Sequence, residues 1–247
     1  MAPDDFFDVG YDTAERVAQE SRDRRQSSSL GRRFWLPNKA GDDPENPINE
    51  ARVIFLGGAK NSDGEATSAP ICWWEHELKI DSRWGNYFTC TLGHEGQCPF
   101  CEKGVSRYYC GGFTIIDTRR WKSKHDGEEH VNEKKFVVFK SDNLSVFHKK
   151  QQKRNKGVLM GTLWETMRTG DKKPREGDQW DFIEAVDLSK VLDVNGDPID
   201  TEVLPYKDFL KPASEERASE VLASWTPPQR GGQGPNKSGY GGKSVKY

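Results

Sequence analysis

The stretch Cys90-Thr-Leu-Gly-His94-Glu-Gly-Gln-Cys98-Pro-Phe-Cys101 gathers three of the chain's five cysteines into one short segment. Clustered thiols of this kind are typical of a metal site, and an odd number of cysteines does not suit a framework of disulfides. Structural zinc takes four protein ligands in a tetrahedron, and Cys90, Cys98 and Cys101 supply three of them. We therefore expect one structural Zn2+ ion here, with its fourth ligand outside this trio.

Two histidines compete to be the fourth ligand. His94 lies within the segment itself, whereas His76 lies on the preceding expected strand. Side chains alternate between the two faces of a strand, so a hairpin that turns about Arg83 makes His76 and Cys90 cross-strand neighbours. Such neighbours have Cβ atoms about 4.5–5.5 Å apart, which lets both side chains reach one ion. We favour His76 and keep His94 as the main alternative. Cys110 and Cys72 are the least favoured candidates.

The same cysteines allow three further interpretations. Cys98-Pro-Phe-Cys101 alone resembles a glutaredoxin active site, but no β-α pattern surrounds it and Cys90 adds a third thiol. A catalytic deaminase zinc needs a His-x-Glu pair, which neither His76-Glu77-Leu78 nor His94-Glu95-Gly96 provides. Free buried thiols are the remaining interpretation. The pattern favours a structural zinc ion and a protein that is not an enzyme.

Outward from the cysteines, the alternation of apolar and polar residues predicts a mainly β (α+β) domain. Strand signals cover residues 52–56, 72–80, 84–90, 113–117, 136–140, 158–168 and 179–186. One helix interrupts the later strands: Ser141 or Asp142 can cap it, Leu144 and Phe147 can face the core, and Gly157 can end it. A strand, a helix and two closing strands is the order in the second half of a five-stranded OB-fold barrel, although other α+β domains share it.

The chain divides into one core and several appended segments. We expect an OB-fold core at residues 30–186 with an inserted zinc subdomain at about 72–112, after an N-terminal arm at 1–29. An acidic segment at 187–226 follows, with a helix expected at 213–225, and a Gly-rich basic tail at 227–247 has the composition of disordered chain. A hydrophobic content of 34% and a mean hydropathy of −0.87 allow only a modest core.

Charge is segregated along the chain. Residues 103–175 contain 18 Lys and Arg against 8 Asp and Glu, whereas residues 176–220 contain 4 against 13. The basic middle is suited to an anionic partner, although two solvated surfaces would give the same counts. No apolar run reaches the roughly 18 residues of a membrane helix, and MAPDDFFDVG is no signal peptide, so we expect a cytoplasmic protein without a membrane partner.

Aromatic residues stand next to basic ones at several places. Bases of a single strand stack on exposed rings while Lys and Arg contact the phosphates, so these residues are candidate DNA contacts. The candidates are Arg33, Trp35, Arg83, Trp84, Arg107, Tyr108, Arg119, Arg120, Trp121, Lys122, Lys149, Lys150, Lys153 and Arg154. The segment 119–130 reads as an exposed β-loop that either clamps a strand or is merely solvated. Rings on apolar faces, namely Trp74, Phe88, Phe113 and Trp164, are expected in the core.

A set of short motifs carries a family resemblance. They are Arg33-Phe-Trp-Leu-Pro37, Trp74-Glu-His76, Trp84-Gly-Asn-Tyr-Phe-Thr-Cys90, Cys98-Pro-Phe-Cys101-Glu-Lys-Gly104, Phe113-Thr-Ile-Ile-Asp117, Gly157-Val-Leu-Met-Gly161, Arg168-Thr-Gly170 and Gly177. Together they resemble the zinc-containing, helix-destabilising single-stranded DNA-binding proteins of tailed bacteriophages. The resemblance covers about residues 30–186.

The resemblance implies an OB-fold whose zinc subdomain braces a basic, aromatic cleft. It implies zinc ligation by His76, Cys90, Cys98 and Cys101, and cooperative self-association through the arm that holds Arg22, Arg24 and Arg25. It also implies phage replication and recombination proteins as partners, and the cytoplasm of an infected bacterial host as the location. Members of that family commonly end in an acidic tail, whereas this chain ends in a basic one, so recruitment of partners by the tail is in doubt.

We therefore expect a protein that binds and protects single-stranded DNA without strong sequence preference during phage DNA replication, recombination and repair. The rivals are a zinc-containing adaptor or transcription-associated factor that binds proteins, a thiol oxidoreductase that uses Cys98 and Cys101, and an RNA-binding protein. Stacking alone does not separate RNA from DNA.

Overall fold

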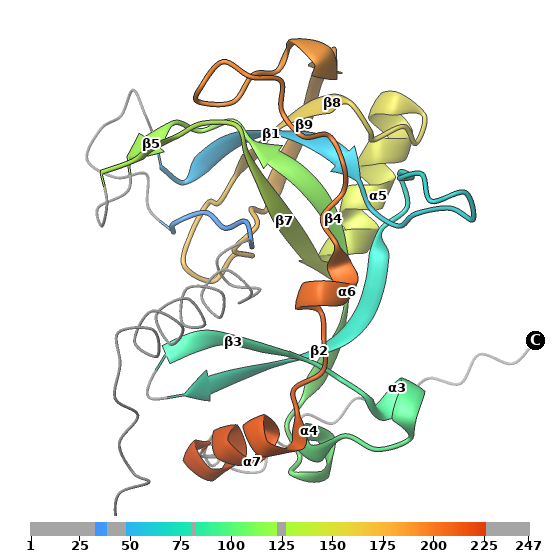
Figure 1. The fold of residues 1–247 in the computed structure, drawn as a ribbon, viewed down its shortest axis with the longest axis vertical. Helices are drawn as coiled ribbons and strands as arrows, with labels where there is room; N and C mark the ends of the chain where they lie inside the picture. The colour runs from blue at the N-terminus through green and yellow to red at the C-terminus, as the bar shows by residue number, and fades with distance from the viewer. Residues whose placement is uncertain (1–32, 39–47, 81–82, 123–126, 226–247) are drawn as a thin grey trace, which may run out of the picture.

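The computed structural model describes residues 33–38, 48–80, 83–122 and 127–225 of the 247-residue chain. The expected N-terminal arm and Gly-rich tail lie outside these residues. Most of the described strands form one twisted antiparallel sheet, with helix α5 on one side of it and the β2–β3 hairpin extending away from β8 and β9 (Figure 1). The expectation of a mainly β protein with some helix is confirmed.

The large sheet has seven strands in the order β3-β2-β4-β1-β8-β9, and β7 also pairs with β4. The strands are β1 (Glu50–Gly57), β2 (Ile71–Ile80), β3 (Arg83–Thr89), β4 (Arg107–Asp117), β7 (Glu133–Lys140), β8 (Thr162–Met167) and β9 (Gln179–Ala185). A separate two-stranded ribbon joins β5 (Trp121–Lys122) to β6 (Glu129–His130).

Strand β4 joins the two halves of the molecule. On one edge its first half pairs with β2, from Ile71 opposite Gly112 to His76 opposite Arg107, and its second half pairs with β1. Its other edge pairs with β7 from Cys110 to Asp117. Gly112 lets the strands pack, because a Cβ atom there would lie 2.2 Å from the ring of Phe136. The β2–β3 hairpin is therefore held on the same strand that forms the centre of the core.

The open side of the sheet is filled by α5 (Ser141–Asn155). Phe147 of this helix is 2% exposed and its ring lies 4.6 Å from that of Phe139 on β7 and 5.3 Å from that of Trp180 on β9. No strand ladder joins β7 to β9 in the described residues, so the closed barrel that we expected is not found there. The core is instead completed by side chains of the helix.

The ends of α5 differ slightly from expectation. The N-cap is Lys140, one residue before the expected Ser141, and its side chain makes no capping hydrogen bond. The helix ends at Lys156, whose φ of 51° is left-handed, and Gly157 follows with a φ of 87°. Leu144 and Phe147 pack against the core as expected.

The chain after β9 returns along the sheet to the segment that contains the clustered cysteines, as the orange to red trace shows (Figure 1). It contains a 3-10 turn (Leu188–Lys190), α6 (Tyr206–Phe209) and α7 (Glu215–Ser224). The hydroxyl of Tyr206 lies 2.6 Å from Thr114 Oγ1, and Ser214 caps α7 by accepting from the backbone N–H of Arg217 at 3.2 Å. The acidic segment is thus folded against the sheet.

Two neighbouring tryptophans on β2 lie on opposite faces of the sheet. Trp73 is 9% exposed and stacks on Phe136 with ring centroids 5.5 Å apart, whereas Trp74 is 40% exposed. The expectation that Trp74 is a core residue is wrong, because the C-terminal segment covers the face of the sheet that carries Trp73. The expected core positions Phe113 and Trp164 are buried. No helix in the described part of the chain is long and apolar enough to cross a membrane.

Candidate metal centre and nucleic-acid interface

Four side chains that we expected to share one ion lie together at the end of the β2–β3 hairpin. His76 projects from β2, Cys90 directly follows β3, Cys98 is the N-cap of α4 (Pro99–Glu102), and Cys101 lies within that helix. Their ligand atoms all lie within 4.8 Å of one another. His76, Cys90 and Cys98 are 0%, 3% and 1% exposed, whereas Cys101 is partly exposed, so the cluster is largely but not wholly shielded from solvent.

The spacing of these atoms suits a tetrahedral ion. His76 Nε2 lies 3.4 Å from the sulfur of Cys98 and 3.6 Å from that of Cys101, and the sulfurs of Cys90 and Cys101 are 3.6 Å apart. Zinc–ligand bonds of about 2.0–2.3 Å place tetrahedral ligands about 3.5–3.8 Å apart. Four protein ligands leave no open position for a substrate or water, so the arrangement is consistent with one structural metal ion such as zinc.

Two neighbours orient and balance the ligands. The carbonyl of Ser106 lies 3.2 Å from His76 Nδ1 and accepts a hydrogen bond from it, which leaves Nε2 free to bind a metal. The guanidinium of Arg107 donates toward the sulfur of Cys90 at 3.6 Å. Three thiolates and one Zn2+ carry one net negative charge, which this cation offsets. Arg107, an expected DNA contact, therefore belongs to the metal centre.

The segment from Cys98 to Glu102, which we call the knuckle, holds two thiols that differ in acidity. Burial opposes ionisation of Cys98, but backbone N–H groups of Cys101, Thr91 and Phe100 lower the pKa of its thiol below the ordinary value. Burial and the neighbouring sulfurs raise the pKa of Cys101 to about 12. A bound cation would stabilise the thiolates and so lower the pKa of both thiols. Metal binding would therefore release protons.

The register that brings His76 to the cluster differs from the expected one. His76 pairs with Phe88, and Cys90 donates its backbone N–H to the carbonyl of Trp74 at 2.8 Å. Arg83 pairs with Ile80, so the hairpin turns one to two residues earlier than we expected. His76 and Cys90 reach the same point diagonally. The side chain of His94, the alternative ligand, lies outside the described residues.

The two remaining cysteines take no part in the cluster. Cys110 is buried on β4, its sulfur lies 3.5 Å from the carbonyl of Trp73, and burial raises the pKa of its thiol. Cys72 is exposed on β2. The cluster is therefore limited to the residues of one hairpin and one knuckle.

A groove of about 520 Å³ lies between the β2–β3 hairpin and the loop that joins β8 to β9. Its cationic side chains are Arg33, Lys140, Arg168, Lys172, Lys173 and Arg175. Its acidic side chains are Glu75, Glu77, Asp171 and Glu176, and its aromatic ones are Phe34, Trp35, Tyr87 and Tyr108. Cations thus outnumber acids in a groove that also presents rings, as a site for a nucleic acid strand requires.

Each of three rings in the groove has a cation over one face. The guanidinium of Arg33 lies 3.7 Å from the centre of Tyr87, and that of Arg175 lies 5.4 Å from Trp35. The ammonium of Lys140 lies 4.1 Å from the centre of Tyr108. Such cation–π contacts fix the position of each ring relative to the charge that lies over it.

A buried ion pair forms the floor of the groove. Arg33 donates to both oxygens of Glu75, at 2.7 and 2.9 Å, and their side chains are 7% and 3% exposed. Trp73 Nε1 at 3.3 Å and the hydroxyl of Tyr108 at 3.0 Å complete the hydrogen bonds of this carboxylate. Because residues 33–36 also pair with β7 and the β8–β9 loop, the ion pair fixes the hairpin to the core.

Arg175 fastens the β8–β9 loop to the opposite wall. Its Nη1 donates to the hydroxyl of Tyr87 at 3.2 Å, and its Nη2 lies 3.6 Å from Glu77. Its backbone carbonyl accepts from Leu36 at 2.7 Å. One side chain therefore joins the loop, the hairpin and the N-terminal segment across the groove.

The expected DNA contacts separate into several places. Arg33, Trp35 and Tyr108 line the groove. The side chains of Arg83 and Trp84 lie outside the described residues.

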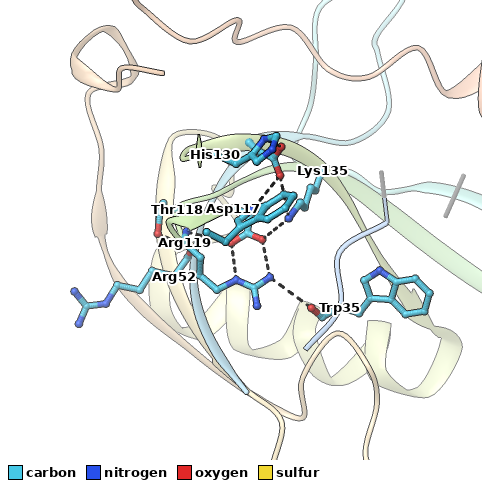
Figure 2. Close-up of polar contacts among 9 residues, drawn as sticks. Trp35, Arg52, Asp117, Thr118, Arg119, His130 and Lys135 are labelled. Carbon is cyan, nitrogen blue, oxygen red and sulfur yellow. Dashed lines mark hydrogen bonds and ion pairs between the residues drawn. The ribbon is translucent and has the colours of Figure 1, made fainter. Parts of the chain in front are cut away.

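Arg119 is held by an ion-pair network (Figure 2). Its guanidinium makes contacts of 2.9 and 2.6 Å to Asp117, whose side chain is 1% exposed, and Lys135 contacts the same carboxylate at 2.9 Å. These cations hold the pKa of Asp117 below its usual value, despite burial. Arg119 also reaches the carbonyl of Trp35 at 3.5 Å, while the indole of Trp35 points away from the network.

The other expected contacts lie on the ribbon and on α5. Trp121, 41% exposed, stacks on His130 with ring centres 4.0 Å apart, and Arg120 lies 3.5 Å from Glu129. Lys122 is exposed on the same ribbon. On α5, Lys150 donates to the carbonyl of Trp180 at 2.9 Å. Three further basic side chains of that helix are exposed and do not line the groove, namely Lys149, Lys153 and Arg154.

The sequence analysis selected only three of the residues that line the groove. Those it did not select include Tyr87, Lys140, Arg168, Lys172, Lys173 and Arg175. A local signal existed for part of this set. Lys172-Lys173-Pro174-Arg175 is a basic run between the last two expected strands, flanked by Gly170 and Gly177. A basic loop at that position faces the inserted hairpin, which only the strand pairing reveals.

Glu176 gives the groove a pH-dependent stability. Burial raises the pKa of this 8%-exposed carboxyl from 4.5 to about 7, although Asn143, Lys140 and Arg33 act in the opposite direction. The folded state then binds its proton more tightly than the unfolded state, so stability falls as pH rises between these two values.

We therefore expect Glu176→Gln to raise the free energy of unfolding above neutral pH by up to about 3 kcal/mol and to leave it nearly unchanged in acid. Urea unfolding across that range measures the effect, with Asp208→Asn, a change on exposed α6, as the control. An equal gain at every pH would contradict this explanation.

No model of a known protein family matches the chain, and no curated protein matches it. The resemblance described above is therefore carried only by the short motifs quoted for it.

Proposed function

We propose that the protein binds single-stranded DNA without strong sequence preference, that it is not an enzyme, and that one zinc ion supports its binding groove. The observation that carries this proposal is the groove itself, which lies between the hairpin that carries the metal cluster and a basic loop. Five cations besides the buried Arg33, and three partly exposed rings besides the buried Phe34, line it. A strand with its bases exposed offers both kinds of partner at once, because phosphates pair with cations and bases stack on rings.

The order of the strands supports an OB-fold. Five of them follow the path β7-β4-β1-β8-β9, with α5 between β7 and β8 in the chain. If these are numbered one to five in chain order from β1, the path is 3-2-1-4-5, which is that of an OB barrel with one seam unpaired. OB-folds bind oligonucleotides across strands 2 and 3 and between the loops after strands 1 and 4.

The groove lies where that comparison would place it. The loop after the first strand holds the β2–β3 hairpin and its metal cluster, and the loop after the fourth holds Lys172, Lys173 and Arg175. Strands 2 and 3 contribute Tyr108 and Lys140 between them. Part of the groove lining also lies within the motifs that resemble the phage family, namely Arg33, Phe34, Trp35, Glu75, Tyr87 and Arg168.

In this proposal the zinc ion has a structural role. His76, Cys90, Cys98 and Cys101 would hold it and tie β2 and the end of β3 to the turn of α4. The bound ion would contribute folding free energy to a subdomain with a small apolar core, and would thereby fix the wall that carries Tyr87.

The experiment that tests the proposal is a tryptophan-fluorescence titration with oligo(dT), oligo(U) and duplex DNA at two salt concentrations. We expect oligo(dT) to bind more tightly than duplex DNA and its affinity to fall with salt, since each phosphate contact displaces counterions. Lys172→Ala, which removes an exposed groove cation without an ion-pair partner among the described residues, should lower the salt slope by about 0.7. Lys207→Ala on α6 is the control.

Equal binding of oligo(U) would make the protein a general single-strand or RNA binder, since nothing in the groove selects the sugar. Failure to bind any oligonucleotide at low salt would contradict the proposal and favour a zinc-containing protein adaptor. A role in phage replication, recombination and repair, with partners from those processes, is a further proposal that rests on the family resemblance.

A further inference from the structure

Glu77 is an acidic side chain in the wall of a groove proposed to bind a polyanion. It lines the groove from β2 and its side chain is 15% exposed. Its carboxylate lies 3.3 Å from Lys140 Nζ and 3.6 Å from Arg175 Nη2. These two cations come from opposite sides, one from β7 and one from the β8–β9 loop. Glu77 therefore stands between two basic groups that have no other acidic partner in the described residues.

We infer that Glu77 occupies, in the free protein, the place that a phosphate of the bound strand takes between Lys140 and Arg175. This inference rests on the proposed function. A carboxylate and a phosphodiester are both anions with oxygens that accept from the same donors. An arriving phosphate exchanges one ion pair for another, so part of its attraction is cancelled by the loss of the carboxylate contacts.

The other acids of the groove cannot make this exchange. Glu75 is bound through both oxygens to Arg33 and also to Trp73 and Tyr108, so no face of it is open. Glu176 is buried and burial raises its pKa to about 7, so it is partly neutral near physiological pH. Asp171 is exposed at the rim, where it accepts from Asn38. Glu77 alone among these four is both ion-paired to groove cations and reachable from solvent.

The arrangement predicts a preference for strands over single phosphates. A strand brings several phosphates and rings into the groove, so its other contacts compensate for the displacement of Glu77. A free nucleotide or inorganic phosphate offers only one anion and has no such compensation. Glu77 would thus act as a specificity-determining residue that keeps the groove free of small anions and lowers its affinity for strands.

The test is the affinity of Glu77→Gln for oligo(dT) and for inorganic phosphate. Glutamine keeps the size and removes the charge, so we expect oligo(dT) to bind about fivefold more tightly than to the wild type, the difference expected for one weak ion pair. The gain should shrink when Lys140 is also replaced, because the two residues act through one another. Phosphate should compete with oligo(dT) more effectively in Glu77→Gln than in the wild type.

Glu165→Gln is the matched control. It removes a carboxylate that is also ion-paired, to Arg52 at 3.2 Å, but that does not line the groove. Equal gains in both variants would show an effect of net charge and overturn the inference, as would an unchanged affinity of Glu77→Gln. If Glu77→Gln does not fold, Glu77→Asp, which withdraws the carboxylate by one methylene, replaces it, and an affinity equal to the wild type overturns the inference.

Failure of the underlying function is separately visible. If the wild type binds no oligo(dT), the proposed function is wrong. If the wild type binds oligo(dT) with the expected salt dependence and Glu77→Gln does not differ from it, only the role of Glu77 is wrong.

Discussion

Replacing Cys98 with serine is expected to abolish stoichiometric zinc binding and to lower the free energy of unfolding by more than about 4 kcal/mol. The cluster needs all four ligands for a closed tetrahedron, and structural zinc contributes about 10–16 kcal/mol of binding free energy in small zinc domains. Little else holds the knuckle. Its apolar core consists of a few side chains of the hairpin and knuckle packed against α7, including Leu78, Phe100 and Val221.

The measurement is urea unfolding together with the zinc content of the purified protein. Cys72→Ser is the control, because Cys72 is exposed and lies outside the cluster. Wild-type stability in Cys98→Ser, with zinc absent from both proteins, would show that the cluster is a group of free thiols. Stable zinc binding in Cys98→Ser would instead show that Cys98 is not a ligand.

Removing the carboxylate of Glu75 has the second-largest expected effect. Glu75→Ala leaves the guanidinium of Arg33 buried without its partner and takes an acceptor from Trp73 and Tyr108. Breaking one side of a buried ion pair costs about 3–5 kcal/mol, because the remaining charge stays desolvated. We expect the free energy of unfolding to fall by that amount.

The exposed pair of Arg52 and Glu165 supplies the comparison. Its side chains are 63% and 47% exposed, so Glu165→Ala should cost less than about 1 kcal/mol. The double change Arg33→Met, Glu75→Leu should recover much of the loss, since it leaves no buried charge. If Glu75→Ala costs no more than Glu165→Ala, the ion pair does not fix the hairpin to the core.

The metal cluster was predictable because both the residue types and the alternation along a strand pointed to it. Three thiols close together in sequence restrict the possible chemistry, and alternation along β2 placed His76 on the face that meets them. The register was predicted incorrectly, because the turn position depends on the pairing of Ile80 with Arg83 and no strong turn motif marks it. The four predicted ligands nevertheless lie together, because a tetrahedral ion can bind diagonal as well as direct cross-strand neighbours.

The groove was only partly predictable. Arg33, Trp35 and Tyr108 were identified by the pairing of aromatic with basic residues, yet the same rule also selected Arg107 and Arg119. Arg107 is held by Cys90, a partner from another part of the hairpin that only the fold reveals, whereas Arg119 is held by Asp117, two residues before it in the sequence.

The choice between Trp73 and Trp74 failed for a similar reason. Alternation shows that the two rings face opposite ways, but not which face a later segment covers. The return of residues 203–206 along the sheet buries Trp73, and nothing near β2 in the sequence announces it.

We propose that the β2–β3 hairpin, which carries the metal cluster, forms one wall of a groove for single-stranded DNA. The most direct test is to compare the affinity of the zinc-loaded protein for oligo(dT) with that of the same protein after chelation. Circular dichroism would establish that the β core remains folded. We predict that chelation weakens binding at least about tenfold, because the groove loses the contacts of one wall. This corresponds to a loss of about 1.4 kcal/mol or more of binding free energy. Equal affinity with and without zinc, or no binding by the zinc-loaded protein, would contradict the claim.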